Sequence, residues 1–146
     1  MPEPSLSESH IDAATLQAYL ETEYRVGGPA PFVLRIGERS AALAATLARA
    51  RVDCCAFIAA VNPFGQVLDE AVNARRHAEL GQDLAARGLA SLEGVGQHPS
   101  NGWPGEESYL VFGLPLAAAK ALGTRLEQNA IVWSGADAVP QLILLR

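Results

Sequence analysis

The chain has 146 residues, of which 49% are hydrophobic and 18% are charged. This composition excludes a largely disordered chain, because disordered segments are poor in apolar residues and rich in charge. Eleven basic and 16 acidic residues give a net charge of −5, which argues against nucleic acid as the main partner, since phosphate binding needs a dense Lys/Arg face. No apolar run approaches the ~20 residues of a membrane span, so we expect no membrane partner.

The cysteines and the first residues bear on where the protein is located. Neighbouring residues in a strand point to opposite faces, so a disulfide between Cys54 and Cys55 is geometrically awkward, and free thiols favour a reducing, cytoplasmic location. Residues 1–10 have neither a basic region nor an apolar core, so we expect a short disordered lead rather than a signal peptide. Residues 11–146 contain no Pro/Gly/Ser linker and are expected to form a single domain.

In the first half of the chain, the pattern predicts helices that alternate with strands. The predicted elements are a helix over 11–24, a strand over 32–36, a helix over 41–51 capped by Ser40, and a strand over 54–61. The last of these reads CCAFIAAV and is apolar on both faces, which is typical of a central strand covered on both sides. Asn62-Pro63 ends it, because proline cannot continue a central ladder.

In the second half, strands become more frequent than helices. The predicted elements are a helix over 67–87, strands over 91–97 and 107–113, a helix over 115–126, and strands over 130–133 and 141–145. The last two strands flank a short loop, so we expect them to pair as a hairpin. Helices that alternate with strands early and strands that cluster late predict an α+β fold. We expect a mixed sheet of about five to six strands with about four helices packed on it.

A charged residue interrupts the apolar stripe of the helix predicted over 67–87. Residues spaced by four form this stripe: Leu68, Val72, Arg76, Leu80 and Leu84. Arg76 is its midpoint and stays charged in a protein. It is therefore expected to extend its head into solvent, to pair with a carboxylate, or to face a polar cavity. The best candidate carboxylates are Glu106 and Glu107, at the start of a predicted strand.

Polar residues from several segments are expected to meet beside this arginine. Asn62 follows the central strand, and ligands of open α/β sheets bind in the crevice at that end. The N-terminus of the next helix offers free backbone N–H groups to an anion. We therefore predict a non-catalytic module that binds a small polar or anionic ligand, with no cofactor and no metal. The predicted ligand site comprises Asn62, Asn73, Arg76, His77, Gln97, His98, Glu107 and Gln128, although Gln128 also fits as a cap of the helix before it.

Two other classes of function stay open. The first is a protein-interaction or regulatory domain, or a homodimer, acting through a sheet edge such as the strand over 141–145. The second is an enzyme with Glu107 or His98 as general base. Because strand residues alternate, at most one of Glu106 and Glu107 can face His98, which disfavours a paired-carboxylate mechanism.

Several short motifs are distributed along the chain: Phe57-Ile58, Asn62-Pro63-Phe64, Asn73 with Arg76, GVGQHP from Gly94, WPGEES from Trp103 and QNAIVW from Gln128. Together they resemble one bacterial family, that of the domain of unknown function 3293. The likeness runs from about Tyr19 to the C-terminus and implies a small, mostly stand-alone bacterial protein. It implies no activity, ligand or catalytic residue. The chain departs from the expected pattern at Gly65, where a small hydroxylated residue would cap the following helix better.

Overall fold

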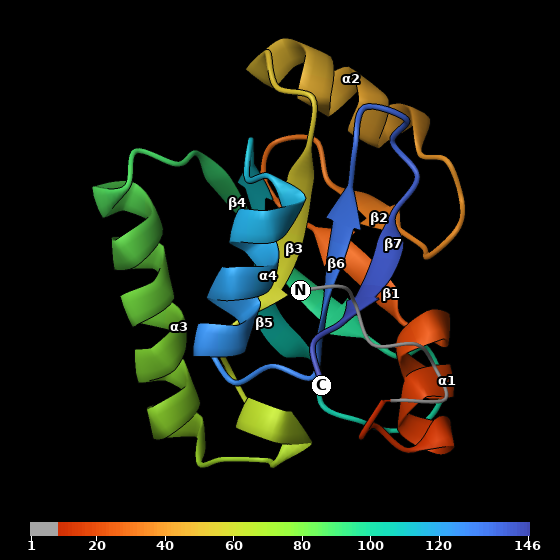
Figure 1. Ribbon diagram of the computed structural model, residues 1–146, viewed down its shortest axis with the longest axis vertical. Helices are drawn as coiled ribbons and strands as arrows, with labels where there is room; N and C mark the ends of the chain where they lie inside the picture. The colour runs from red at the N-terminus through yellow and green to blue at the C-terminus, as the bar shows by residue number, and fades with distance from the viewer. Residues whose placement is uncertain (1–8) are drawn as a thin grey trace.

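The computed structural model describes residues 9–146, which form one curled antiparallel sheet with helices against both faces (Figure 1). The helices are α1 (Ala13–Glu21), α2 (Ala41–Ala50), α3 (Glu70–Ala86) and α4 (Leu116–Arg125), with a 3-10 turn at Pro63–Gly65. The strands are β1 (Glu23–Val26), β2 (Phe32–Leu34), β3 (Cys55–Ala59), β4 (Ser91–Gln97), β5 (Glu106–Phe112), β6 (Ala130–Ser134) and β7 (Gln141–Leu144). The predicted lead over 1–10 falls mostly outside the described residues.

The α+β class and the four helices are confirmed within residues 9–146, but the mixed sheet of five to six strands is wrong. Seven strands lie in the order β2-β1-β4-β5-β3-β6-β7, and each neighbouring pair is antiparallel. The additional strand is β1, whose first two residues overlap the end of the helix predicted over 11–24. Tyr24 and Val26 are buried while Arg25 is exposed, so the period here is two rather than helical.

Strand β3 is central, as its apolar sequence predicts, because it pairs with β5 on one side and β6 on the other. One face of the sheet packs against α3 and α4, through a core that includes Ile58, Leu84 and Leu122. The other face packs against α2, through a core that includes Leu43, Phe57 and Leu110. Both cysteines are buried and free, and no helix in the described part of the chain is long and apolar enough to cross a membrane.

The helix predicted over 67–87 begins later than its apolar spacing indicates. Helix α3 starts at Glu70, so Leu68 precedes it, and Val72 is exposed. A side-chain bond explains the delay, since the Leu68 backbone N–H donates to Asn62 Oδ1 at 3.1 Å. Leu80 and Leu84 of the predicted stripe are buried, and so is His77, which lies outside the stripe. By contrast, α2 begins as predicted, with the Leu43 backbone N–H donating to Ser40 Oγ at 3.0 Å.

Candidate functional site

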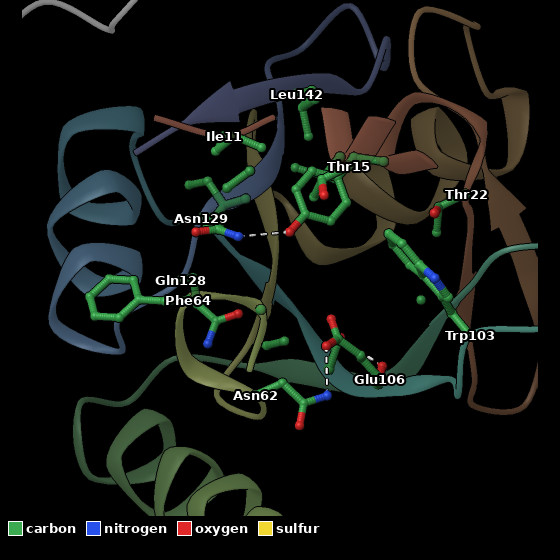
Figure 2. Close-up of a pocket in the computed structure, with 18 of the residues that line it drawn as sticks. Ile11, Thr15, Thr22, Asn62, Phe64, Trp103, Glu106, Gln128, Asn129 and Leu142 are labelled. Atoms are coloured by element: carbon green, nitrogen blue, oxygen red, sulfur yellow. Dashed lines mark hydrogen bonds between the residues drawn. The ribbon is translucent and has the colours of Figure 1, made fainter. Parts of the chain in front are cut away.

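A cavity of about 540 Å³ lies on the sheet face that also carries α2 (Figure 2). Its volume falls within the range of small-molecule sites. Helix α1 and the loop over 98–105 form two of its walls, and strands β3, β5 and β6 contribute to its floor. Residues 62–67 and Arg146 complete the lining. The cavity therefore draws on segments from both halves of the chain, which only the tertiary fold brings together.

Asp12 and Glu106 are carboxylates that line this cavity; Asp12 is the exposed N-cap of α1, whereas Glu106 lies at the floor. It begins β5 and is partly buried, with its side chain directed toward Asn62 (Figure 2). Asn62 Nδ2 donates to Glu106 Oε2 at 2.8 Å. Burial raises the pKa of Glu106, and the hydrogen bond from Asn62 opposes that shift by favouring the ionised form. Within residues 9–146, Glu106 makes no ion pair and Oε1 accepts no hydrogen bond, so this oxygen is available to a ligand.

Asn62 is held in place by its own network. Its backbone is left-handed, with φ 49°, a region that Asn tolerates better than most residues. Asn62 Oδ1 accepts from Asn73 Nδ2 at 2.7 Å and from the Leu68 backbone N–H, while the Asn62 backbone N–H donates to Asn73 Oδ1 at 3.0 Å. Because Oδ1 is occupied by two donors, Nδ2 is the group left to face Glu106. Asn73 thus acts on the cavity through Asn62.

A second polar cluster lies on the opposite side of the cavity. Asn129 Nδ2 donates to Tyr19 Oη at 3.0 Å, and Arg146 Nη1 donates to Asn129 Oδ1 at 3.3 Å. The Arg146 guanidinium also lies 4.4 Å from the centroid of the Phe64 ring. Gln128 Nε2 donates to the carbonyls of Val61 and Leu126, so Gln128 both lines the cavity and binds the C-terminal end of α4.

His98 lines the cavity, but both of its ring nitrogens are already engaged. Nδ1 accepts from the backbone N–H groups of Ser100 and Asn101, so Nε2 carries the proton and donates to Glu21 Oε1 at 2.9 Å. This bond lowers the pKa of Glu21. Gln97 Nε2 donates to the carbonyl of Trp103 at 2.9 Å. The two residues therefore shape the loop that carries Trp103, and His98 has no free nitrogen to act as a general base.

Three residues of the predicted ligand site lie away from the cavity. Glu107 is exposed and, by strand alternation, belongs to the face opposite Glu106. His77 is buried and its Nε2 lies 2.9 Å from Glu93 Oε1, while its ring stacks on Tyr109 at 4.3 Å between centroids. Arg76 lines a separate, smaller cavity of about 270 Å³. Asn62, His98 and Gln128 are the predicted residues that line the main cavity.

The structure also brings in residues that the sequence reasoning did not assign to the site. These are Tyr19, Trp103, Glu106, Asn129 and Arg146. Alternation alone indicates that at most one of the two adjacent glutamates can face His98, but not which one. The register supplies the answer, because Glu106 lies directly across from Gly96, which also lines the cavity. Tyr19 lies within the helix predicted over 11–24, and helical spacing does not distinguish a core residue from a cavity residue.

Arg76 bonds to backbone carbonyls rather than to a carboxylate. Its Nε donates to the Ala60 carbonyl at 2.5 Å and its Nη2 to the Leu126 carbonyl at 2.9 Å. Ala60 follows β3 and Leu126 follows α4, so the guanidinium joins the ends of two elements. In the described part of the chain it forms no ion pair with Glu106 or Glu107. The helix N-terminus proposed for an anion is flanked by Asp69 and Glu70, which disfavour one.

Replacing Arg76 should therefore destabilise the fold. We expect Arg76→Met to lose about 1–2 kcal/mol of unfolding free energy, because two carbonyls lose a charged donor. Arg75→Met, the exposed neighbour, should stay within about 0.5 kcal/mol of wild type. In a double-mutant cycle by urea denaturation, Arg76→Met and Glu107→Gln should be additive within about 0.5 kcal/mol. A larger coupling would show that the two side chains interact.

Replacing Glu106 should change how stability depends on pH. Since burial raises its pKa above the ordinary 4.5, the folded state binds the proton more tightly, and stability falls as pH rises from 4.5 through the folded pKa. Glu106→Gln removes this loss and keeps an oxygen to accept from Asn62. We expect the variant to gain roughly 0.5–1 kcal/mol at neutral pH and nothing at acidic pH. Thermal melting at a series of pH values measures this difference. A stability difference between the two proteins that stayed constant across pH would contradict the prediction.

The cavity offers hydrogen bonding and apolar contact. Glu106 supplies acceptors, the Tyr19–Asn129–Arg146 cluster supplies both donors and acceptors, and Phe57 and Trp103 supply apolar surface. No group of three or more His, Cys, Asp or Glu side chains is arranged to hold a metal ion within residues 9–146. The combination of hydrogen-bonding groups and apolar surface suits an organic ligand.

Comparisons with known proteins place the chain in one family. No curated protein and no solved structure matches it. A family model matches residues 58–131, a range that begins in β3, contains α3, β4, β5 and α4, and ends in β6. This range holds Asn62, Asn73 and Glu106, and it leaves out Tyr19 and Arg146. The chain belongs to the family described as protein of unknown function (DUF3293).

Proposed function

We propose that the protein is a non-catalytic module that binds a small organic molecule in the cavity over Glu106. The observation that carries this proposal is the state of that carboxylate. It is partly buried, one oxygen is held by Asn62, and the other faces the cavity without a hydrogen-bond donor from residues 9–146. That oxygen is not itself buried, so it is open to a hydrogen-bond donor in the cavity, as is typical of a site that a ligand completes.

The polar groups around the cavity are already positioned. Asn62 is fixed by Asn73, Tyr19 is bonded to Asn129, and His98 holds the loop that precedes Trp103. A ligand would therefore order few side chains on binding, which limits the entropic cost of association. This preorganisation supports binding as the role of the site.

Blocking the cavity tests the proposal. Gly96 lies across from Glu106, and a Cβ there would meet Thr22 and Tyr24 at 3.8 Å, so a larger side chain can enter the cavity without an initial clash. A fragment library screened by ¹H–¹⁵N chemical shifts should give hits at cavity residues, and Gly96→Leu should abolish them. Ala85→Leu adds the same side chain at an exposed position and should leave them unchanged. Hits that avoid the cavity or survive Gly96→Leu would contradict the proposal.

A catalytic role is the second candidate, and Glu106 is the residue that favours it. A carboxyl with a raised pKa in a cavity is typical of a general acid or base. The expected bases, Glu107 and His98, are respectively outside the cavity and fully bonded. An activity found by substrate screening should then fall at least tenfold in Glu106→Gln, and survive in Glu107→Gln.

A homodimer through a sheet edge is also compatible with the topology. Strands β2 and β7 lie at the two edges, so β7 has a free side for pairing with a second copy. We propose that such a homodimer would form through β7 and that each copy would still bind its ligand in its own cavity. A monomeric mass by light scattering at high protein concentration would overturn it.

A further inference from the structure

We infer that the cavity's ligand carries a protonated amine, which pairs with Glu106 Oε1 between aromatic walls. This inference rests on the proposed binding function and specifies its chemistry. Its starting point is that Glu106 is a carboxylate that lines a cavity and has no cationic partner among the described side chains. The sheet presents this group at the floor, and Asn62 and Trp103 approach the same space from two sides (Figure 2).

The charge distribution of the cavity favours a cation at this position. Asn62 donates to Oε2 and so favours the ionised carboxylate. Arg146, the cationic lining residue, is engaged with Asn129 and with the Phe64 ring. A partly buried carboxylate without a counter-ion costs free energy, and a ligand ammonium group would offset that cost by charge pairing and hydrogen bonding.

The aromatic residues around Glu106 supply the second element of amine recognition. Tyr19, Tyr24, Phe57 and Trp103 all line the cavity. Burial raises the pKa of both Tyr19 and Tyr24, and the charge of Glu106 adds a smaller increase, so both phenols lie within electrostatic range of the carboxylate. The rings of Tyr24 and Phe57 meet edge to face, 5.5 Å between centroids. Aromatic faces attract cations, so rings beside a carboxylate form a site for an ammonium group attached to an apolar body.

The same features disfavour an anionic ligand at this end of the cavity. An acid group next to Glu106 would face a like charge and the acceptor Oε1. A neutral hydroxyl would satisfy Oε1 but would leave the carboxylate charge without a counter-ion. Of the three ligand chemistries, the amine is therefore the one that satisfies both the hydrogen bond and the charge.

Three probes that share one ring and differ in charge test this inference. They are 2-phenylethylamine, 2-phenylethanol and 3-phenylpropanoate, each titrated into the full chain at neutral pH with ¹H–¹⁵N chemical shifts as the readout. We expect the amine to bind most tightly and to perturb residues around Glu106. Glu106→Gln should weaken amine binding by roughly 10- to 100-fold and leave the alcohol nearly unchanged. Glu107→Gln, which removes the adjacent charge on the opposite face, should leave amine binding within about twofold of wild type.

The outcomes separate the inference from the proposed function. If the alcohol or the acid binds as tightly as the amine, or if Glu106→Gln does not weaken the amine, the amine inference is overturned while cavity binding stands. If none of the three probes perturbs the cavity and the fragment hits also avoid it, both are overturned. Folding of Glu106→Gln is checked by its wild-type-like spectrum, since glutamine preserves shape and the bond from Asn62.

Discussion

Gly94→Ala is expected to lose about 2–3 kcal/mol of unfolding free energy, because the sheet has no room for a methyl group at this position. A Cβ on Gly94 would lie 2.5 Å from the Arg25 carbonyl oxygen and 2.8 Å from Phe57 Cε2. The first atom is backbone of the paired strand β1 and the second belongs to a buried ring, so neither can move freely. Overpacking of this kind displaces backbone or forces side chains out of their preferred rotamers.

The matched control for this change lies on the same face of the same strand. A Cβ on Gly96 would meet its nearest atoms at 3.8 Å, which is ordinary van der Waals contact. Gly96→Ala should therefore stay within about 0.5 kcal/mol of wild type in urea denaturation. If Gly94→Ala and Gly96→Ala lost equal unfolding free energy, the close approach of Phe57 would not be the reason that β4 needs glycine at position 94. Because Phe57 also lines the cavity, Gly94→Ala should in addition shift resonances there.

Asn62→Ala is expected to lose about 2–3 kcal/mol, through both its side chain and its backbone. The amide joins Asn73, Leu68 and Glu106, and alanine would leave these groups without their partners. Alanine is also disfavoured at a φ of 49°. Chemical denaturation measures the total loss, and binding of the amine probe should weaken because Glu106 is no longer held.

Asn62→Gly separates the two contributions. Glycine adopts the left-handed region without strain, so it should be more stable than alanine by roughly 1 kcal/mol while still lacking the side-chain bonds. Asn101→Ala serves as a control, since its Oδ1 accepts from Trp103 at an exposed site and its loss should stay below about 1 kcal/mol. If Asn62→Ala proved no more destabilising than Asn101→Ala, the hydrogen bonds of Asn62 would not be stabilising the chain between β3 and α3.

Local patterns predicted most of the secondary structure because they depend on neighbours in sequence. The cap at Ser40, the strand over Ser91–Gln97 and the central apolar strand all follow from short-range rules, and the structure confirms them. The strand Glu23–Val26 was the exception. Only Thr22 separates its four residues from α1, and Tyr24 continues the helical spacing of that segment. What makes it a strand is pairing with β2 and β4, a long-range contact that no local pattern reveals.

The sequence by itself determined the α+β class, the central position of β3 and its end before Asn62-Pro63, because periodicity and turn residues act locally. Only the tertiary structure decided the antiparallel order of the strands and which glutamate enters the cavity. Strand register sets that choice, since a shift of one residue exchanges the faces of Glu106 and Glu107. The tertiary structure also decided the partners of Arg76, which are backbone carbonyls at the ends of β3 and α4. Every residue carries such a carbonyl, so no pattern of side chains indicates which ones accept the bonds.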